Sequence, residues 1–254
     1  MDHTVGISIA AFVIILALLI LLRAINSKYE VRPTDIAVAI LPVVIFLLVT
    51  GKIHKFEVGG LSIETAFVNA STSAITPQVT QLIGLPSDPI QTDPKRGVEE
   101  IPRLIEKKTQ GLLFRLADSS YYGPAIREYL VLLAKQPFLR YVIIENPDRT
   151  FFGMADARAL AELISSDHPP YTADEFAKWL ATSDKAALKR LPGFIASESA
   201  GTETTDKAQA LQSMESLNID TLPVINKDKR FVGIVNRSRL TASLILDVAK
   251  ELKK

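Results

Sequence analysis

The sequence contains no cysteine among its 254 residues, and it has only three histidines and one tryptophan. The absence of cysteine excludes a disulfide framework, a cysteine zinc site and a cysteine nucleophile. The histidines are scattered along the chain, so no Ser-His-Asp set or metal-spaced cluster is visible. No glycine-rich phosphate loop is present either. We therefore expect no intrinsic enzymatic activity and no metal. The formal net charge of +1 gives no bias toward a nucleic-acid partner.

Two long apolar segments occupy the N-terminal region. Residues 5–22, VGISIAAFVIILALLILL, carry no charge and nearly span a hydrocarbon core of about 30 Å. Residues 36–51 are shorter and include Pro42, which a membrane helix tolerates when its neighbours satisfy the freed carbonyl. The leading MDHT lacks the basic residues of a signal peptide. The pattern predicts an uncleaved two-pass hairpin over residues 1–54, and the alternative for the second segment is a buried or re-entrant helix.

A β-hairpin and a linker are expected over residues 55–100. Gly59-Gly60 lies between two alternating runs, which predicts a two-residue turn that pairs Val58 with Leu61. The same register pairs Phe56 with Ile63 and Lys55 with Glu64. The hairpin is either a spacer docked on the soluble domain or a subunit contact above the membrane. The Ser/Thr-rich and proline-containing stretches that follow are typical of a linker, so we expect the soluble domain to begin near Ile101.

The soluble region contains an internal repeat. Residues 141–164, YVIIENPDRTFFGMADARALAELI, resemble residues 222–245, LPVINKDKRFVGIVNRSRLTASLI. Gly153 aligns with Gly233, with one extra residue in the first turn. Each copy is preceded by a helical pattern and, before that, by a short strand candidate, GLLFRLA or GFIAS. Each copy therefore predicts a strand–helix–strand–strand–helix unit, and two such units can share a core. We place the copies at residues 101–168 and 193–254.

A helical insertion is expected between the copies, over residues 169–192. Thr172 and Glu175 fit a capping box at its start. Phe176, Trp179 and Leu180 fall on one helical face. Trp179 is interpreted as a packing residue and not as a ligand platform, because tryptophan buries a large apolar area.

The repeat resembles the cystathionine-β-synthase (CBS) domain family, most strongly in LPVINKDKRFVGIVNRSRL and less so in YVIIENPDRTFFGMADARAL. The resemblance implies tandem β-α-β-β-α repeats that pair into a pseudo-symmetric module, with clefts that bind adenosine-type ligands. It also implies a regulatory role, homo-oligomerisation, and control of an attached or neighbouring membrane protein. The expected ligand is an adenine nucleotide or a cyclic dinucleotide. The fold class we expect is thus two transmembrane helices followed by an α+β soluble region.

The family's ligand motif is glycine, two hydrophobic residues, Ser or Thr, two further residues, and Asp. In the second copy Asn236 stands at the Ser/Thr position and Arg239 at the Asp position. In the first copy Asp156 and Ala159 take those places. Neither copy has the acid that the family uses to hold ribose, which argues against ordinary adenosine binding.

In each copy the second strand of the strand pair leads into the last helix, and this junction is here called the corner. The charge around the corner of the second copy suggests an anionic ligand instead. Asn236 is a suitable N-cap, and a helix N-terminus with nearby guanidinium groups favours phosphate or an anionic lipid headgroup. The alternative is that these side chains extend into solvent, where screening is strong. The candidate ligand residues, from both copies, are Asn236, Arg237, Arg239, Lys229, Arg230, Asp156 and Arg158.

Three functions remain open from the sequence. The first is a membrane-anchored CBS-pair sensor, the second a dimerisation or partner-recruitment module that binds no ligand, and the third a membrane effector activated by a signalling nucleotide. The basic residues near the membrane, three in the loop against two after the second span, faintly favour an exported soluble region. Nucleotide sensing is typical of cytoplasmic domains, so we expect the soluble region on the cytoplasmic side of an inner or plasma membrane.

Overall fold

A computed structural model describes residues 40–45, 47, 57–58, 61–92 and 98–251. Residues 40–45 and 47 are helical, and the rest of both predicted membrane spans lies outside the described residues. Within the described part of the chain, no helix has both the length and the apolar character needed to cross a membrane. The membrane hairpin therefore stays a prediction from the sequence.

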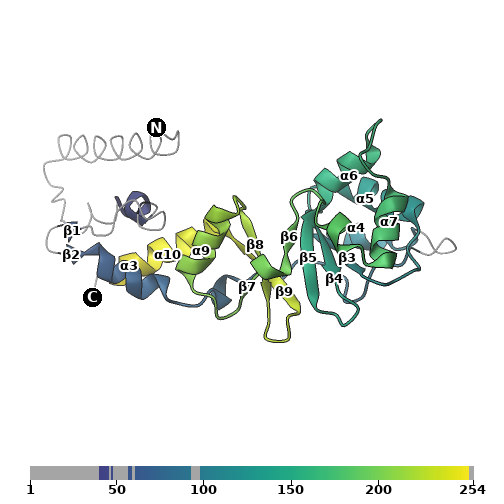
Figure 1. Cartoon of the computed structure of the whole chain (residues 1–254). Helices are drawn as coiled ribbons and strands as arrows, with labels where there is room; N and C mark the ends of the chain where they lie inside the picture. Colours follow the sequence, from purple (N-terminus) through teal and green to yellow (C-terminus); the bar gives the residue numbers. More distant parts are fainter. Residues whose placement is uncertain (1–39, 46, 48–56, 59–60, 93–97, 252–254) are drawn as a thin grey trace, which may run out of the picture. The chain divides into compact units, whose positions relative to one another are not determined.

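The chain divides into two compact units (Figure 1), which are described separately. The first unit is formed by three separate stretches of chain: Met1–Gln78, Thr204–Thr221 and Asn236–Lys254. Its described elements are strands β1 (Glu57–Val58) and β2 (Leu61–Ser62), helix α3 (Ile63–Ser71), the 3-10 helix η1 (Thr76–Gln78), and helices α9 (Lys207–Ser216) and α10 (Arg237–Glu251).

The first unit is a small helical cluster. Helix α10 packs against both α3 and α9, and it buries Leu240, Leu244 and Val248 at four-residue spacing. Helix α9 contributes a matching apolar face that includes Met214. The segment after α3 is tied to the start of α9, because Ile75 N donates to the Thr205 carbonyl at 2.9 Å. This segment is therefore part of the folded unit.

The stretches expected to be a linker, residues 69–81 and 84–102, are part of the fold where the structure describes them, so that interpretation is wrong for residues 69–81, 84–92 and 98–102. The β1–β2 pairing of Val58 with Leu61 is confirmed, but Ile63 begins helix α3 and does not continue the strand. Ile75 and Ile90 are fully or almost fully buried. The linker reading failed because Ser and Thr in short helices, and Pro in tethered loops, have the same composition as unstructured linkers.

The second unit holds the two larger sheets and the remaining helices, within residues Val79–Glu203 and Leu222–Val235. Its strands are β3 (Gly111–Arg115), β4 (Tyr141–Glu145), β5 (Phe151–Asp156), β6 (Ile195–Ala196), β7 (Gly201–Thr202), β8 (Thr221–Ile225) and β9 (Phe231–Asn236), the last two reaching one residue past its limits. Its helices are α4 (Ile101–Glu106), α5 (Gly123–Ala134), α6 (Ala157–Ser165), α7 (Ala173–Thr182), α8 (Lys185–Leu188) and the 3-10 helix η2 (Ser197–Ser199).

The larger sheet has the order β3-β4-β5-β6, with β3 parallel to β4 and the other pairs antiparallel. Figure 1 shows α4, α5, α6 and α7 gathered on one side of its central strands. Alternate strand residues such as Leu112, Phe114 and Val142 bury under these helices. The intervening residues, which include Leu113 and Ile143, face the other side of the sheet. That second face lines the candidate site described below.

The smaller sheet has the order β7-β8-β9, with β7 parallel to β8. The predicted order of elements is present in both copies, as β3-α5-β4-β5-α6 and β7-α9-β8-β9-α10. The expected first strand of the second copy is wrong, however. Residues 195–196 within GFIAS form β6, which pairs with β5 of the first copy, and β7 takes the place beside β8.

A further contact joins the second sheet to the segment that precedes the first copy. Thr80 forms an isolated antiparallel bridge to Ile234 in β9, with hydrogen bonds of 2.8 and 2.9 Å. Each sheet therefore receives an edge segment from outside its own copy. Gly233 permits this contact, because a Cβ at that position would lie 2.5 Å from the Thr80 carbonyl oxygen.

The two copies align without the extra residue expected in the first turn. Tyr141 corresponds to Thr221 and Gly153 to Gly233, a constant offset of 80 residues (221 − 141 and 233 − 153). The two hairpin turns also share their backbone bonds, since the Asn at 146 or 226 donates to the carbonyl four residues later. Arg149 and Lys229 hold the same left-handed conformation, with φ of 67° and 57°.

The insertion between the copies contains α7 and α8. The capping box of Thr172 and Glu175 is confirmed, with hydrogen bonds in both directions. Trp179 packs against Tyr171 with ring centroids 4.8 Å apart, and the guanidinium of Arg190 lies 5.8 Å from the Trp179 ring. The packing role expected of Trp179 is therefore confirmed.

Candidate functional site

The two corners expected to bind a ligand have their main side chains engaged inside the protein. Asp156 caps α6 by accepting from the backbone N–H groups of Arg158 and Ala159. Asn236 accepts from the backbone N–H and hydroxyl of Ser238 at the start of α10. Both caps therefore occur as expected from their residue types.

Arg237 points toward the helix that precedes it in its copy. Its Nε donates to the Ile219 carbonyl at 3.1 Å, and its Nη2 donates to the Met214 carbonyl near the end of α9. Its Nη1 also pairs with Glu215 at 2.8 Å. Carbonyl groups at a helix C-terminus favour a cation, so this arrangement accounts for Arg237 without a ligand.

Arg158 makes the same kind of contact in the first copy. Its Nε and Nη2 donate to the carbonyls of Leu139 and Gln136, both at 2.8 Å. These carbonyls follow the end of α5. The structure thus assigns both arginines to the link between two helices of one copy.

The other predicted ligand residues are not brought together with the corner. Lys229 and Arg230 belong to the turn before β9, whereas Asn236 ends that strand. Six strand residues at about 3.3 Å each separate the two ends by roughly 20 Å. The side chain of Arg239 is exposed on α10. A shallow hollow of about 630 Å³ lies at the corner, lined by Asn236, Arg237 and others. Its lining also includes the carboxylate of Asp220, which is unfavourable for an anionic ligand.

Two cavities of the second unit are better formed. The first, here called the strand cleft, has a volume of about 360 Å³, within the usual range of small-molecule sites. Its walls come from the sheet faces that carry Leu113 and Ile143 in the first copy and Phe231 in the second, and from the segment after Thr80. The lining residues are Gln81, Leu82, Leu85, Pro86, Ser87, Leu113, Ile143, Glu145, Phe231 and Val232.

The strand cleft is lined by apolar side chains from both copies, by polar groups and by one carboxylate. Leu113 and Ile143 come from the first copy, and Phe231 and Val232 from the second. The Phe231 ring lies 5.5 Å from that of Phe151 with a tilt of 31°, which fixes its position at the edge of the cleft. A flat aromatic ligand could occupy such a surface.

Glu145 is the carboxylate of the strand cleft, and it is held in place by Arg115. The two side chains form an ion pair at 3.1 Å and are 15% and 20% exposed, respectively. The Arg115 backbone N–H donates to the Tyr121 hydroxyl at 2.6 Å, and burial raises the pKa of Tyr121 well above its usual value. Arg115 Nε is buried with no acceptor among the described residues. The pair thus presents an oriented carboxylate to the cleft.

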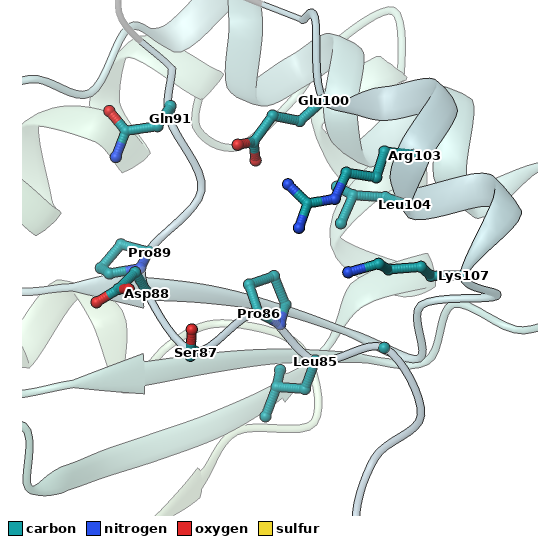
Figure 2. Close-up of a pocket in the computed structure, with 11 residues that line it drawn as sticks. Leu85, Pro86, Ser87, Asp88, Pro89, Gln91, Glu100, Arg103, Leu104 and Lys107 are labelled. Atoms are coloured by element: carbon teal, nitrogen blue, oxygen red, sulfur yellow. The ribbon is translucent and has the colours of Figure 1, made fainter.

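The second cavity, here called the α4 cavity, has a volume of about 410 Å³. Figure 2 shows it between α4 and the opposite loop, with Arg103, Lys107 and Glu100 directed inward. Its lining residues are Gly84, Leu85, Pro86, Ser87, Asp88, Pro89, Gln91, Glu100, Arg103, Leu104 and Lys107. Three of them, Leu85, Pro86 and Ser87, also line the strand cleft.

The loop that closes the α4 cavity is fixed at both ends. At one end Ile83 and Gln110 exchange hydrogen bonds, and the Thr109 hydroxyl donates to the Gly84 carbonyl. At the other end Ile90 N donates to the Leu113 carbonyl at 3.0 Å. Residues 85–89, here called the arch, span the distance between these two anchors. The arch therefore forms a preformed wall.

Sequence reasoning missed both cavities, because it treated residues 84–102 as a linker. One signal was present in IPRLIEKK, where Arg103 and Lys107 stand four residues apart and so share a helical face. No group of three or more His, Cys, Asp or Glu side chains suited to a metal ion occurs in the described part of the chain.

Comparison with known proteins bears on this fold. Residues 202–245 match the CBS domain. The match runs from β7 into α10 and confirms the resemblance to CBS domains for the second copy. The first copy has the same order of elements, as described above, and so repeats the CBS topology. No curated protein matches the chain.

Several solved CBS proteins resemble the structure at low identity. A CBS domain pair/ACT domain protein from Thermotoga maritima is 14% identical, with 68% of this chain and 97% of that chain covered and a TM-score of 0.35. A CBS domain-containing protein from Kribbella flavida is also 14% identical, with 68% and 99% covered and a TM-score of 0.37. The CBS domain of a membrane protein from Sphaerobacter thermophilus is 13% identical, with 70% and 91% covered and a TM-score of 0.35. At these low TM-scores, nothing is carried over from these proteins to this chain.

Proposed function

We propose that this chain is a membrane-anchored regulatory protein whose paired CBS-type copies bind a nucleotide. The observation that carries the proposal is the strand cleft, because β-strands of both copies contribute to one cavity. The match of residues 202–245 to the CBS domain supports a regulatory role. The apolar segments at residues 5–22 and 36–51 support the membrane anchor.

The nucleobase occupies the strand cleft in this proposal. Leu113, Ile143 and Val232 supply apolar walls, and Phe231 supplies an aromatic surface. Glu145 accepts hydrogen bonds from the ribose hydroxyls and so replaces the acid that is missing from both family motifs. Its ion pair with Arg115 orients the carboxylate before the ligand arrives, which lowers the cost of ordering it on binding.

Binding in the strand cleft links the two sheets physically. A ligand that contacts β3, β4 and β9 together favours the arrangement in which all three strands line one cavity. The stabilisation of that arrangement increases with the logarithm of the ligand concentration once this exceeds the dissociation constant. The change passes to the membrane segments or to a regulated membrane partner, with the soluble region in the cytoplasm. Protease accessibility of the soluble region in spheroplasts and in intact cells tests this orientation.

Calorimetry of the detergent-solubilised full chain tests ligand binding. AMP, ATP and a cyclic dinucleotide are titrated against wild type and Glu145→Gln, which keeps the side-chain shape but removes the charge. We expect saturable binding to wild type and at least about tenfold weaker binding to the variant, since a lost charged hydrogen bond is worth roughly 1.5–3 kcal/mol. Glu162→Gln, an exposed position on α6, serves as the control. Absence of saturable nucleotide binding to wild type would overturn the proposal.

A second function is favoured by a separate observation. Leu246 on α10 is 60% exposed, and Ala242 beside it on the same face is also exposed. An exposed apolar helix face suits a homodimer or a recruited partner. In that case the CBS pair associates without a ligand. Light scattering of wild type and Leu246→Glu distinguishes this function, because only an interface at α10 makes the variant dissociate.

A further inference from the structure

The α4 cavity contains two cations that have no ionic partner among the residues that the structure describes. Arg103 and Lys107 both line the cavity and are exposed to solvent. Neither forms an ion pair or a side-chain hydrogen bond with any residue that the structure describes. Figure 2 shows the guanidinium of Arg103 and the ammonium of Lys107 directed toward the arch. Both positive charges therefore lie in the α4 cavity.

The placement of these cations is not explained by helix stability alone. Lys107 follows Arg103 by four residues, and like charges at this spacing repel on a helix surface. Both lie near the C-terminal end of α4, where the helix dipole favours cations and offsets part of that repulsion. The dipole does not require the two side chains to share a cavity, however. Buried Ile101 and Leu104 fix the orientation of α4, and that orientation turns both cations toward the arch.

The cavity is lined by two cations and two carboxylates, and one of these carboxylates is already paired with a cation outside the lining. Asp88 lies on the arch and already pairs with Arg149 at 3.4 Å. Glu100 lies at the start of α4 and makes no ion pair within the described residues. Two cations therefore face one uncompensated carboxylate. The Ser87 hydroxyl adds a neutral donor to the wall of the cavity.

We propose that the α4 cavity binds the phosphate groups of a phosphate-bearing ligand. Arg103 donates two parallel hydrogen bonds to one phosphate group, and Lys107 neutralises a further phosphate oxygen. Ser87 donates from the arch. Glu100 accepts from a hydroxyl of the ligand or orients Arg103. Because the arch is anchored at both ends, the cavity is formed before the phosphate arrives.

This inference rests on the proposed function in one respect. The α4 cavity and the strand cleft share Leu85, Pro86 and Ser87 as lining residues. A nucleotide with its base in the strand cleft can therefore place its phosphates in the α4 cavity. A longer phosphate chain reaches Arg103 and Lys107 better than a single phosphate does. The inference thus predicts a preference for ATP over AMP, and it assigns that preference to α4.

The test uses the full chain with inorganic pyrophosphate as the first probe. Arg103→Ala/Lys107→Ala is compared with wild type and with Arg127→Ala/Lys178→Ala, which removes the same two charges from exposed positions on α5 and α7. We expect wild type and the control to bind pyrophosphate with a strong salt dependence. The α4 variant binds at least tenfold more weakly. Because Arg103 and Lys107 are exposed, its thermal midpoint stays close to that of wild type, which excludes unfolding as the cause.

ATP and AMP separate this inference from the proposed function. If the inference holds, the α4 variant loses the preference for ATP and keeps most of its affinity for AMP. If both double variants bind pyrophosphate and ATP as wild type does, the inference is overturned while nucleotide binding stands. If no nucleotide binds but pyrophosphate binding depends on Arg103 and Lys107, the proposed function fails and the inference stands.

A third probe identifies the source of the phosphate. Glycerol 3-phosphate carries the phosphate chemistry of an anionic lipid headgroup in soluble form. Preferential binding of this probe, lost in the α4 variant, assigns the cavity to a lipid headgroup. Preferential binding of ATP assigns it to a free nucleotide. Failure of wild type to bind any of the phosphate probes overturns the inference.

Discussion

Arg158 and Arg237 make equivalent contacts in the two copies, although they are one position out of register. With the 80-residue offset, Arg158 corresponds to Ser238, and Arg237 corresponds to Ala157. Both guanidinium groups nevertheless donate to two carbonyls that precede the strand pair of their own copy. A cation in the first turn of a helix is unfavourable for that helix. Here the hydrogen bonds to carbonyls at or after the C-terminal end of the preceding helix offset this cost.

Replacement of Arg237 by alanine should lower the free energy of unfolding. The variant loses the bonds to the Met214 and Ile219 carbonyls and the ion pair with Glu215. We expect a loss of about 1–3 kcal/mol, because hydrogen bonds that involve a charged group contribute in this range. Chemical denaturation followed by circular dichroism measures the change. Arg127→Ala is the matched control, and equal stability of the two variants would show that Arg237 is not a structural link.

Replacement of Gly233 by alanine should weaken the contact between Thr80 and β9. The added Cβ would lie 2.5 Å from the Thr80 carbonyl oxygen and 3.0 Å from its carbon, and both are backbone atoms. The Thr80 segment must therefore move away, which breaks its two hydrogen bonds to Ile234. We expect faster amide hydrogen exchange at Thr80 and Ile234. Unchanged exchange at these two amides would contradict the prediction.

The pair of Lys207 and Asp247 should make stability depend on acid pH. Lys207 is 3% exposed, and its ammonium contacts the carboxylate of Asp247 and the hydroxyl of Ser243. Burial alone would raise the pKa of Asp247, but the hydrogen bond and charge of Lys207 outweigh it, and the pKa lies below its usual value. A depressed pKa stabilises the fold above the unfolded-state pKa of about 4 and loses this contribution as the pH falls through the folded-state value.

Asp247→Asn tests this dependence. At pH 7 we expect the variant to unfold at lower denaturant concentration than wild type, because the buried Lys207 loses its counter-charge. The difference should shrink as the pH falls from about 5 to about 3, since wild type then also loses the charge of Asp247. Denaturation midpoints measured across this range supply the comparison. A difference that is constant with pH would argue against the ion pair as its cause.

Replacement of Lys229 by glycine should raise stability slightly. Lys229 has a φ of 57°, a left-handed conformation that costs a non-glycine residue about 1–2 kcal/mol. Glycine removes this cost but adds freedom to the unfolded chain, worth about 0.4–1 kcal/mol. We expect a net gain below about 1 kcal/mol in equilibrium unfolding. Arg149→Gly, at the equivalent turn with a φ of 67°, should show a gain of similar size. Opposite signs at the two turns would refute the equivalence.

The local features of the fold could be predicted from the sequence. The repeated order of elements, the pairing of Val58 with Leu61 and the capping box at Thr172 each depend on neighbouring residues, and each is present. Pairing between distant segments could not be predicted. Nothing near Thr80 or Ile195 indicates that Thr80 bridges β9 or that Ile195 pairs with β5. Such contacts depend on the whole topology and not on local patterns.

The candidate site illustrates the same limit. An anion site was predicted around Asn236 because several basic residues lie close to it in sequence. In the structure β9 separates Lys229 from the corner. The charges of Arg103 and Lys107 lie at the start of the first copy, directly after a stretch whose composition is typical of a linker. Their common cavity depends on the arch, residues 85–89, whose anchors Gln110 and Leu113 lie more than 20 residues further along the chain. Charge density in the sequence was therefore a poor guide to the site.

The exchange of edge segments has a consequence for how this chain can be divided into fragments. Because β6 completes the sheet of the first copy and Thr80 reaches β9 of the second, neither copy is self-sufficient. A half-chain made from one copy would expose an unpaired strand edge, which is a template for aggregation. Truncation between the copies should therefore yield insoluble halves that regain solubility only when they are expressed together. The two copies therefore fold only together.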